Sequence, residues 1–132
     1  MTPQENLNIV RRFLEEGKIE LMREDATFRD FTLEKPVVGR ETISELINNM
    51  YNVSFPGAQA EFRNVIAGEE SVVLEFTFRG VHRGELMGIP PTGNTVEIPM
   101  CAVYDLKDGM IQRGRLYYDG ATMASQLGLT AE

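Results

Sequence analysis

A change of hydrophobic period divides this chain at the Phe55-Pro56-Gly57 turn. Before the turn, apolar residues recur at helical spacing, and after it they alternate. The stretch 71–79 alternates most clearly and places four apolar side chains on one face: Val72, Leu74, Phe76 and Phe78. Helices followed by long strands predict an α+β fold, in which a curved antiparallel sheet carries the N-terminal helices over its concave face. Such a concavity is a usual place for a small-molecule site.

Local signals set the order of the elements. Thr2, Pro3 and Glu5 have the spacing of a capping box, which predicts that the first helix begins there and ends at Gly17. A second amphipathic helix follows Gly39. The other expected elements are a short helix at 18–22, strands at 26–31, 62–66, 71–79, 95–106 and 110–118, and a last helix at 121–127.

Length and charge bound the class of protein. The 132 residues suit a single domain over 1–132. The net charge of −7 argues against nucleic-acid and anionic-membrane partners, which favour a basic surface. The first residues do not resemble a signal peptide, and no apolar run approaches the ~18 residues of a membrane span. We therefore expect a cytoplasmic protein.

The chain is poor in reactive side chains. Cys101 is the single cysteine and His82 the single histidine, which excludes an internal disulfide and metal sites built from several cysteines or histidines. Phosphate-binding glycine loops and the common hydrolase and redox motifs are also absent from the sequence. Any chemistry must therefore depend on carboxylates, tyrosines, arginines and one histidine.

Two carboxylates are candidates for proton transfer. Asp119 follows the last strand, and at the rim of an apolar cavity its pKa would be raised by desolvation. The same position also suits the N-cap of the last helix. Asp30 stands between Phe28 and Phe31, where it is either a buried base or a solvated turn residue.

Other candidates also have two interpretations. His82 shares strand parity with the apolar face, where it either shuttles a proton or is a structural group. Tyr51 follows the second amphipathic helix, where it either donates to a ligand carbonyl or contacts solvent. Met50 and the other methionines suit an adaptable pocket or an ordinary core. Cys101 is interpreted as a small apolar residue rather than a nucleophile.

The run 80–93, GVHRGELMGIPPTG, resembles the G-T-H-x-G-x-x-x-G-x-P-P-T-G stretch of SnoaL-like polyketide cyclases. These proteins belong to the NTF2-like superfamily of cone-shaped α+β barrels. The Phe55-Pro56 turn, the Asp108-Gly109 hairpin and the ending formed by Asp119 and Gln126-Leu127-Gly128 resemble the same family. The likeness spans nearly the whole chain.

This resemblance implies an intramolecular aldol ring closure that uses neither a metal nor an organic cofactor. Asp119 matches the family's general acid/base, and His82 matches a histidine beside it. An apolar pocket would hold the polyketide ester. Arg115 stands where the family usually has a tryptophan, and Val81 replaces a threonine. These departures predict a pocket and a substrate that differ from those of the family.

Two sister families can be compared in the same way. Resemblance to ketosteroid isomerases places their base on Asp30 but their two oxyanion donors on Phe13 and Cys101, which argues against that activity. Resemblance to limonene epoxide hydrolases places their Asp-Arg-Asp set on apolar side chains: Phe76, Phe78 and Leu116.

The sequence therefore predicts an NTF2-like cone-shaped barrel that acts as a SnoaL-like cyclase, or a related lyase or isomerase, on an apolar carbonyl compound. The predicted catalytic residues are Asp119, His82 and Asp30; the predicted pocket residues are Tyr51, Tyr117, Tyr118, Phe13, Met50 and Cys101. We expect no cofactor, no metal and a homodimer formed through the outer sheet face. The alternatives are a non-catalytic small-molecule binder and a dimeric scaffold with a filled cone.

Overall fold

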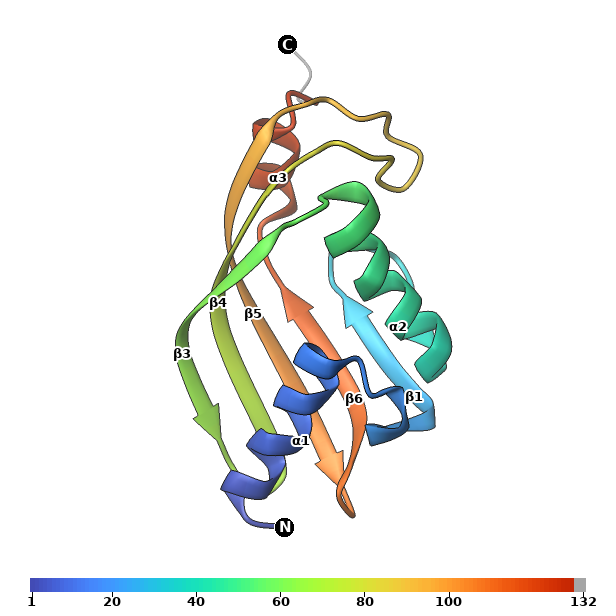
Figure 1. The fold of residues 1–132 in the computed structure, drawn as a ribbon, viewed down its shortest axis with the longest axis vertical. Helices are drawn as coiled ribbons and strands as arrows, with labels where there is room; N and C mark the ends of the chain where they lie inside the picture. The colour runs from blue at the N-terminus through green and yellow to red at the C-terminus, as the bar shows by residue number, and fades with distance from the viewer. Residues whose placement is uncertain (130–132) are drawn as a thin grey trace.

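The computed structural model describes residues 1–129. The elements follow in the order α1 (Pro3–Glu16), η1 (Ile19–Leu21), β1 (Met22–Asp30), β2 (Val37–Val38), α2 (Arg40–Asn49), η2 (Met50–Ser54), β3 (Gln59–Ala67), β4 (Ser71–Val81), β5 (Thr95–Lys107), β6 (Met110–Tyr117) and α3 (Gly120–Gln126). Strands β1 and β2 lie between α1 and α2, and the longer run of strands β3 to β6 follows, so the predicted α+β class is confirmed (Figure 1). None of the helices within residues 1–129 is long and apolar enough to cross a membrane.

The six strands form one curved sheet in the order β2-β1-β6-β5-β4-β3. Four neighbouring pairs are antiparallel, but β1 runs parallel to β6. The prediction of a purely antiparallel sheet is therefore wrong. The reason is topological, because β1 is followed by helices and by the other strands before the chain returns beside it, and no hairpin joins the two.

The two faces of the sheet differ in chemistry. The inward side chains of β4 and β5 are buried: Leu74, Phe76, Phe78, Ile98, Met100 and Ala102. The outward residues include Glu75, Arg79 and Glu97. Helices α1 and α2 lie over the inward, concave face (Figure 1). Packing between this face and the two helices makes the core, as alternation along the strands predicts.

The Gln126 side chain joins helix α3 to the first residues of β5. The Gln126 amide donates to the Glu97 carbonyl (3.0 Å) and accepts from the Glu97 backbone N–H (2.7 Å). The paired register of β6 reaches Cys101 at Tyr117 and does not extend to Glu97. The Gln126 side chain therefore makes the two hydrogen bonds that a neighbouring strand would make there.

Helix α1 is capped at both ends and anchored by a buried side chain near its start. The Thr2 hydroxyl accepts from Glu5 N while the Glu5 carboxylate accepts from Thr2 N, and the helix ends at Gly17, whose φ of +67° suits glycine. Asn6 is fully buried, and its Nδ2 donates to the carbonyls of Gly68 and Glu69, at 3.0 and 2.9 Å. Asn6 thereby joins the helix to the turn between β3 and β4.

Replacing Asn6 with aspartate should destabilise the fold strongly. The substitution exchanges an amide that donates to two carbonyls for a buried carboxylate that faces them, so we expect a loss of about 3 kcal/mol or more in the free energy of unfolding. Urea titration measures the loss. Asn8→Asp, on the exposed side of the same helix, is the control and should change stability by less than about 0.5 kcal/mol. Equal effects of the two variants would show that the buried amide does not anchor the helix.

Candidate active site

A cavity of about 380 Å³ lies between the concave face of the sheet and the helices that cover it. Its volume is within the range of small-molecule sites. Its walls are mainly apolar side chains from α1, α2, η2 and the sheet: they include Phe13, Leu46, Ile47, Met50, Phe76, Phe78 and Met100. Within residues 1–129, its charged lining consists of Asp30 and the exposed Glu15, and no lysine or arginine takes part.

Asp30 is the one buried carboxylate within residues 1–129, with 4 % of its surface exposed. It ends β1 on the inward parity that it shares with Phe28. Its Oδ1 accepts from the Thr32 backbone N–H (2.9 Å) and from the Thr32 hydroxyl (2.7 Å), while its Oδ2 accepts only a long hydrogen bond from the Tyr118 hydroxyl (3.4 Å). Oδ1 is therefore held by the turn, and Oδ2 is the oxygen left for a ligand.

A half-buried tyrosine and a buried one line the same cavity. Tyr51 is on η2 and Tyr104 on β5. Burial raises the pKa of Tyr51 to about 12, and burial together with the nearby Tyr51 raises the pKa of Tyr104. Both phenols are therefore neutral donors at pH 7. Neither hydroxyl is hydrogen-bonded to another protein group within residues 1–129, so both are available to a ligand oxygen.

Gly114 makes room for the rings on the sheet side of the cavity. A Cβ at this position would lie 2.7 Å from the Phe28 ring and 3.1 Å from the Tyr104 ring. Tyr104 stands directly opposite Gly114 in the β5–β6 pairing. The glycine therefore lets two aromatic rings approach the backbone of β6.

Comparison with known proteins identifies the family. Residues 7–127 match the family model described as SnoaL-like polyketide cyclase. The chain belongs to this family. A search of curated proteins found no match.

Solved structures confirm the NTF2-like fold of this SnoaL-like chain. A Jannaschia sp. CCS1 protein assigned as a SnoaL-like polyketide cyclase aligns with a TM-score of 0.86 and 21% identity, over 98% of this chain and 95% of that one. IdmH of Streptomyces antibioticus, assigned as a polyketide cyclase, aligns with a TM-score of 0.71 and 24% identity, over 97% of this chain and 99% of that one. A Catenulispora acidiphila DSM 44928 protein with a ketosteroid isomerase-like fold, solved in complex with trimethylamine, aligns with a TM-score of 0.72 and 17% identity, over 98% of this chain and 96% of that one. At these identities the likeness shows the fold alone.

Asp119 lies outside the lining of the cavity. It is exposed and caps α3: its Oδ1 accepts from the backbone N–H groups of Ala121 (3.0 Å) and Thr122 (3.3 Å), and its Oδ2 accepts from the Thr122 hydroxyl (2.9 Å). These hydrogen bonds hold the pKa of the Asp119 carboxyl below its usual value, so the predicted raised pKa is wrong. Its surroundings are those of a helix cap and not of an acid/base group in an apolar pocket.

His82 is fully buried on the apolar side, but it does not line the cavity. Its Nδ1 accepts from the Thr92 backbone N–H (3.2 Å) and lies 3.0 Å from the Thr92 hydroxyl. Its ring is 5.4 Å from the ring of Phe55. His82 therefore joins the two stems of the loop that follows β4. Its hydrogen bonds go to Thr92 and those of Asp119 go to Ala121 and Thr122, so the two predicted catalytic residues are not bonded to each other.

Four predicted positions near the end of the sheet also need comment. Cys101 lies between the cavity-lining Met100 and Ala102, so strand alternation turns it to the outer face, contrary to the prediction. Tyr117 is likewise outward and stacks on Phe31, at 4.7 Å between ring centroids. Tyr118 contacts Asp30 without lining the cavity. Arg115 bonds to Asp105 on the outer face and does not line the cavity.

The structure brings together Asp30, Tyr51, Phe13 and Met50 from the predicted set, and it adds Tyr104, which sequence reasoning missed. A signal for Tyr104 was present, since it shares strand parity with Met100 and Ala102. No group of three or more histidine, cysteine, aspartate or glutamate side chains suited to a metal ion occurs in the described part of the chain, residues 1–129.

Removing the Asp119 cap should lower stability in a pH-dependent way. Because folding lowers the pKa of this carboxyl, its stabilisation is present above the unfolded value of 3.8 and is lost as the pH falls through the folded value. Asp119→Ala should therefore lower Tm at pH 7, and the gap from the unmodified protein should shrink below about pH 4. Asp119→Asn keeps a neutral cap and serves as the control. A gap between unmodified protein and Asp119→Ala that stays the same at pH 3 would contradict this role.

Proposed function

We propose that this SnoaL-like chain is an enzyme that transfers a proton at a carbon next to the carbonyl of a small apolar compound. Asp30 is the base in this proposal. The observation that carries it is a buried carboxylate with one loosely bonded oxygen, in the wall of a cavity that also presents two free phenols. Cyclisation and isomerisation both begin with this step.

The proposed step uses only side chains that line the cavity. Asp30 Oδ2 takes the proton, and the negative charge moves to the carbonyl oxygen of the substrate. Tyr51 and Tyr104 donate hydrogen bonds to that oxygen, where they stabilise the charge as it develops. Thr32 keeps Oδ1 occupied and so orients the carboxylate. The lack of a cationic group in the lining of residues 1–129 favours an uncharged substrate over a carboxylate or a phosphate.

Sequence comparison argued against ketosteroid isomerase chemistry because one of the expected oxyanion donors falls on Phe13, whose ring cannot donate a hydrogen bond. The structure supplies another donor nearby. The Tyr104 ring lies edge-on to Phe13, at 6.3 Å between centroids, and provides a phenol in the same part of the cavity. A phenylalanine at position 13 is therefore no reason to reject enolate chemistry.

Two further observations support a ligand-binding role. One neighbour with the same fold was solved in complex with trimethylamine, a small molecule. The cavity of this chain is open space, which does not fit the alternative of a filled scaffold.

For the assembly we propose a homodimer formed through the outer sheet face, where Phe31 and Tyr117 are exposed. Analytical ultracentrifugation of a Tyr117→Lys variant tests that contact.

Asp30→Asn should abolish proton transfer while it preserves the shape of the cavity. The protein is incubated in D₂O containing EDTA with a panel of neutral, apolar β-keto esters, and deuterium uptake next to the carbonyl is followed by NMR. We expect uptake above the buffer rate for at least one ester, and a decrease of about 10²–10⁴-fold in Asp30→Asn. Asp119→Asn, the matched carboxylate outside the cavity, should keep the unmodified rate.

Equal rates in Asp30→Asn and the unmodified protein would refute Asp30 as the base. Binding of the esters with no uptake in any of them would favour the non-catalytic binder. Loss of uptake in Asp119→Asn but not in Asp30→Asn would return the role to Asp119.

Tyr51→Phe and Tyr104→Phe should each slow uptake without loss of stability. Each substitution removes a donor worth about 10²-fold in rate, but it removes no protein hydrogen bond. Deuterium uptake and Tm are measured together. A large fall in Tm with an unchanged rate would show that the hydroxyls serve the fold instead.

A further inference from the structure

Met87 occupies a backbone conformation that its side chain disfavours. Its φ is +44°, and that of Gly88 is +85°. The two residues form the tip of a tight turn, in which Leu86 N donates to the Ile89 carbonyl (3.0 Å) and Ile89 N donates to the Leu86 carbonyl (2.8 Å). A two-residue turn with positive φ at both central positions prefers asparagine, aspartate or glycine at the first of them.

A second turn of the same kind in this chain follows that preference. Asp108 and Gly109 have φ values of +52° and +78° and connect β5 to β6. Aspartate is suited to this position, whereas an unbranched apolar side chain gains nothing there from its own backbone. The conformation of the turn therefore does not explain why position 87 is a methionine, and an interaction of the Met87 side chain with something outside the turn is the alternative.

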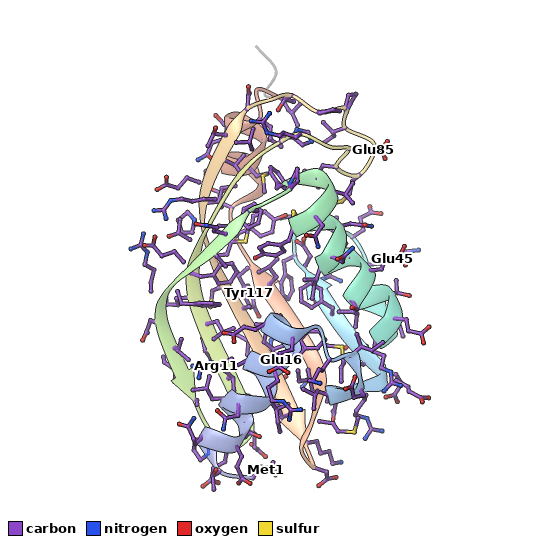
Figure 2. The ribbon with its side chains drawn as sticks, in the orientation of Figure 1. Met1, Arg11, Glu16, Glu45, Glu85 and Tyr117 are labelled. Atoms are coloured by element: carbon purple, nitrogen blue, oxygen red, sulfur yellow. The ribbon has the colours of Figure 1, made fainter. Side chains whose placement is uncertain are left out.

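The loop that carries Met87 is held firmly at its base. The Ser54 hydroxyl donates to the Glu85 carbonyl (2.6 Å), and the Ser54 carbonyl accepts from Arg83 N and Gly84 N (3.0 and 3.2 Å). A Cβ at Gly84 would lie 1.9 Å from the Val53 carbonyl oxygen, so the loop packs directly on η2. Figure 2 shows Glu85 in this loop, beside the end of the α2–η2 segment. The position of the turn over the helices is therefore set by its stem.

The Met87 side chain is at the boundary between the cavity and solvent. It is 55 % exposed, yet it belongs to the lining of the cavity. One side of it therefore faces water and the other faces the interior. A flexible, polarisable thioether suits such a position because it can pack against ligand ends of different shape.

We propose that Met87 closes the mouth of the cavity over the distal end of an elongated, uncharged apolar ligand and so sets the ligand length that the site accepts. The inference rests on the cavity of the proposed function but not on its reaction. The strained turn holds the side chain at the mouth, and the apolar walls hold the body of the ligand. Shortening the side chain at position 87 should therefore lengthen the preferred ligand.

A homologous series of ligands tests this role. Alkyl phenyl ketones of increasing chain length compete with the neutral fluorescent probe N-phenyl-1-naphthylamine, whose signal is free of interference because the chain has no tryptophan. For the unmodified protein, Kd should fall about fourfold per added methylene and then stop falling at one chain length. In Met87→Gly this limit should move to a chain about three methylenes longer, the reach of the lost side chain.

Matched variants separate the turn from the side chain. Met87→Leu keeps an apolar side chain of similar reach and should keep the limit. Met87→Asn suits the turn, has a shorter side chain and should move the limit as Met87→Gly does. Met87→Gly and Met87→Asn should both raise Tm relative to the unmodified protein, by about 2–5 °C, because glycine and asparagine tolerate the positive φ at this position. Asp108→Gly alters the equivalent turn far from the cavity lining and should leave the limit unchanged.

An unchanged limit in both Met87→Gly and Met87→Asn would overturn the proposal, as would an equal displacement in Asp108→Gly. Failure of every ketone to bind the unmodified protein would overturn it as well. Binding is measured without turnover, so the chain-length limit does not depend on proton transfer. A limit that moves with residue 87 in a protein without proton-transfer activity would support this inference while it refutes the proposed function.

Discussion

The uninterrupted pairing of β4 with β5 is the constraint on which the rest of the molecule depends. It runs from Ser71 opposite Asp105 to Val81 opposite Thr95, with no shift of register. Because side chains alternate with a period of two, a slip by one residue would turn the inward aromatic and methionine side chains to the outer face. The same alternation turns Tyr104 inward and Cys101 outward. The ladder therefore determines both where the core lies and which polar groups the cavity receives.

A cavity inside a small domain lacks packing contacts that a filled core would have, so its walls must be held by other interactions. Asn6 supplies some of them, since it holds α1 against the β3–β4 turn with a buried amide. Gly114 lets the rings of Phe28 and Tyr104 approach the backbone of β6. Ser54 joins the loop after β4 to η2. These three groups do not line the cavity, and together they fix the helix, the rings and the loop that surround it.

Local patterns predicted the elements well, because capping residues and hydrophobic periods act over a few positions. They also placed His82 on an inward parity, and it is buried, whereas they left Asp30 open between a buried base and a solvated turn residue. They failed where distant segments meet. The parallel pairing of β1 with β6 depends on the path by which the chain comes back beside β1. The hydrogen bonds between His82 and Thr92 depend likewise on how the loop after β4 folds back on its own stem. Tyr104 was missed for another reason: it has the right parity but no neighbouring motif, so nothing distinguished it from other inward strand residues.

The contrast between Asp119 and Asp30 shows why residue type alone does not identify a base. Both are aspartates at the end of a strand, and family resemblance favours Asp119. Each oxygen of Asp119 already accepts a short hydrogen bond from the α3 terminus, so protonation would remove a helix cap. In Asp30 the bonds from Thr32 are concentrated on Oδ1, and Oδ2 keeps only the long contact with Tyr118. A proton can therefore join Oδ2 while the turn that orients the carboxylate remains intact. In the proposed reaction, Oδ1 therefore positions the carboxylate and Oδ2 takes the proton.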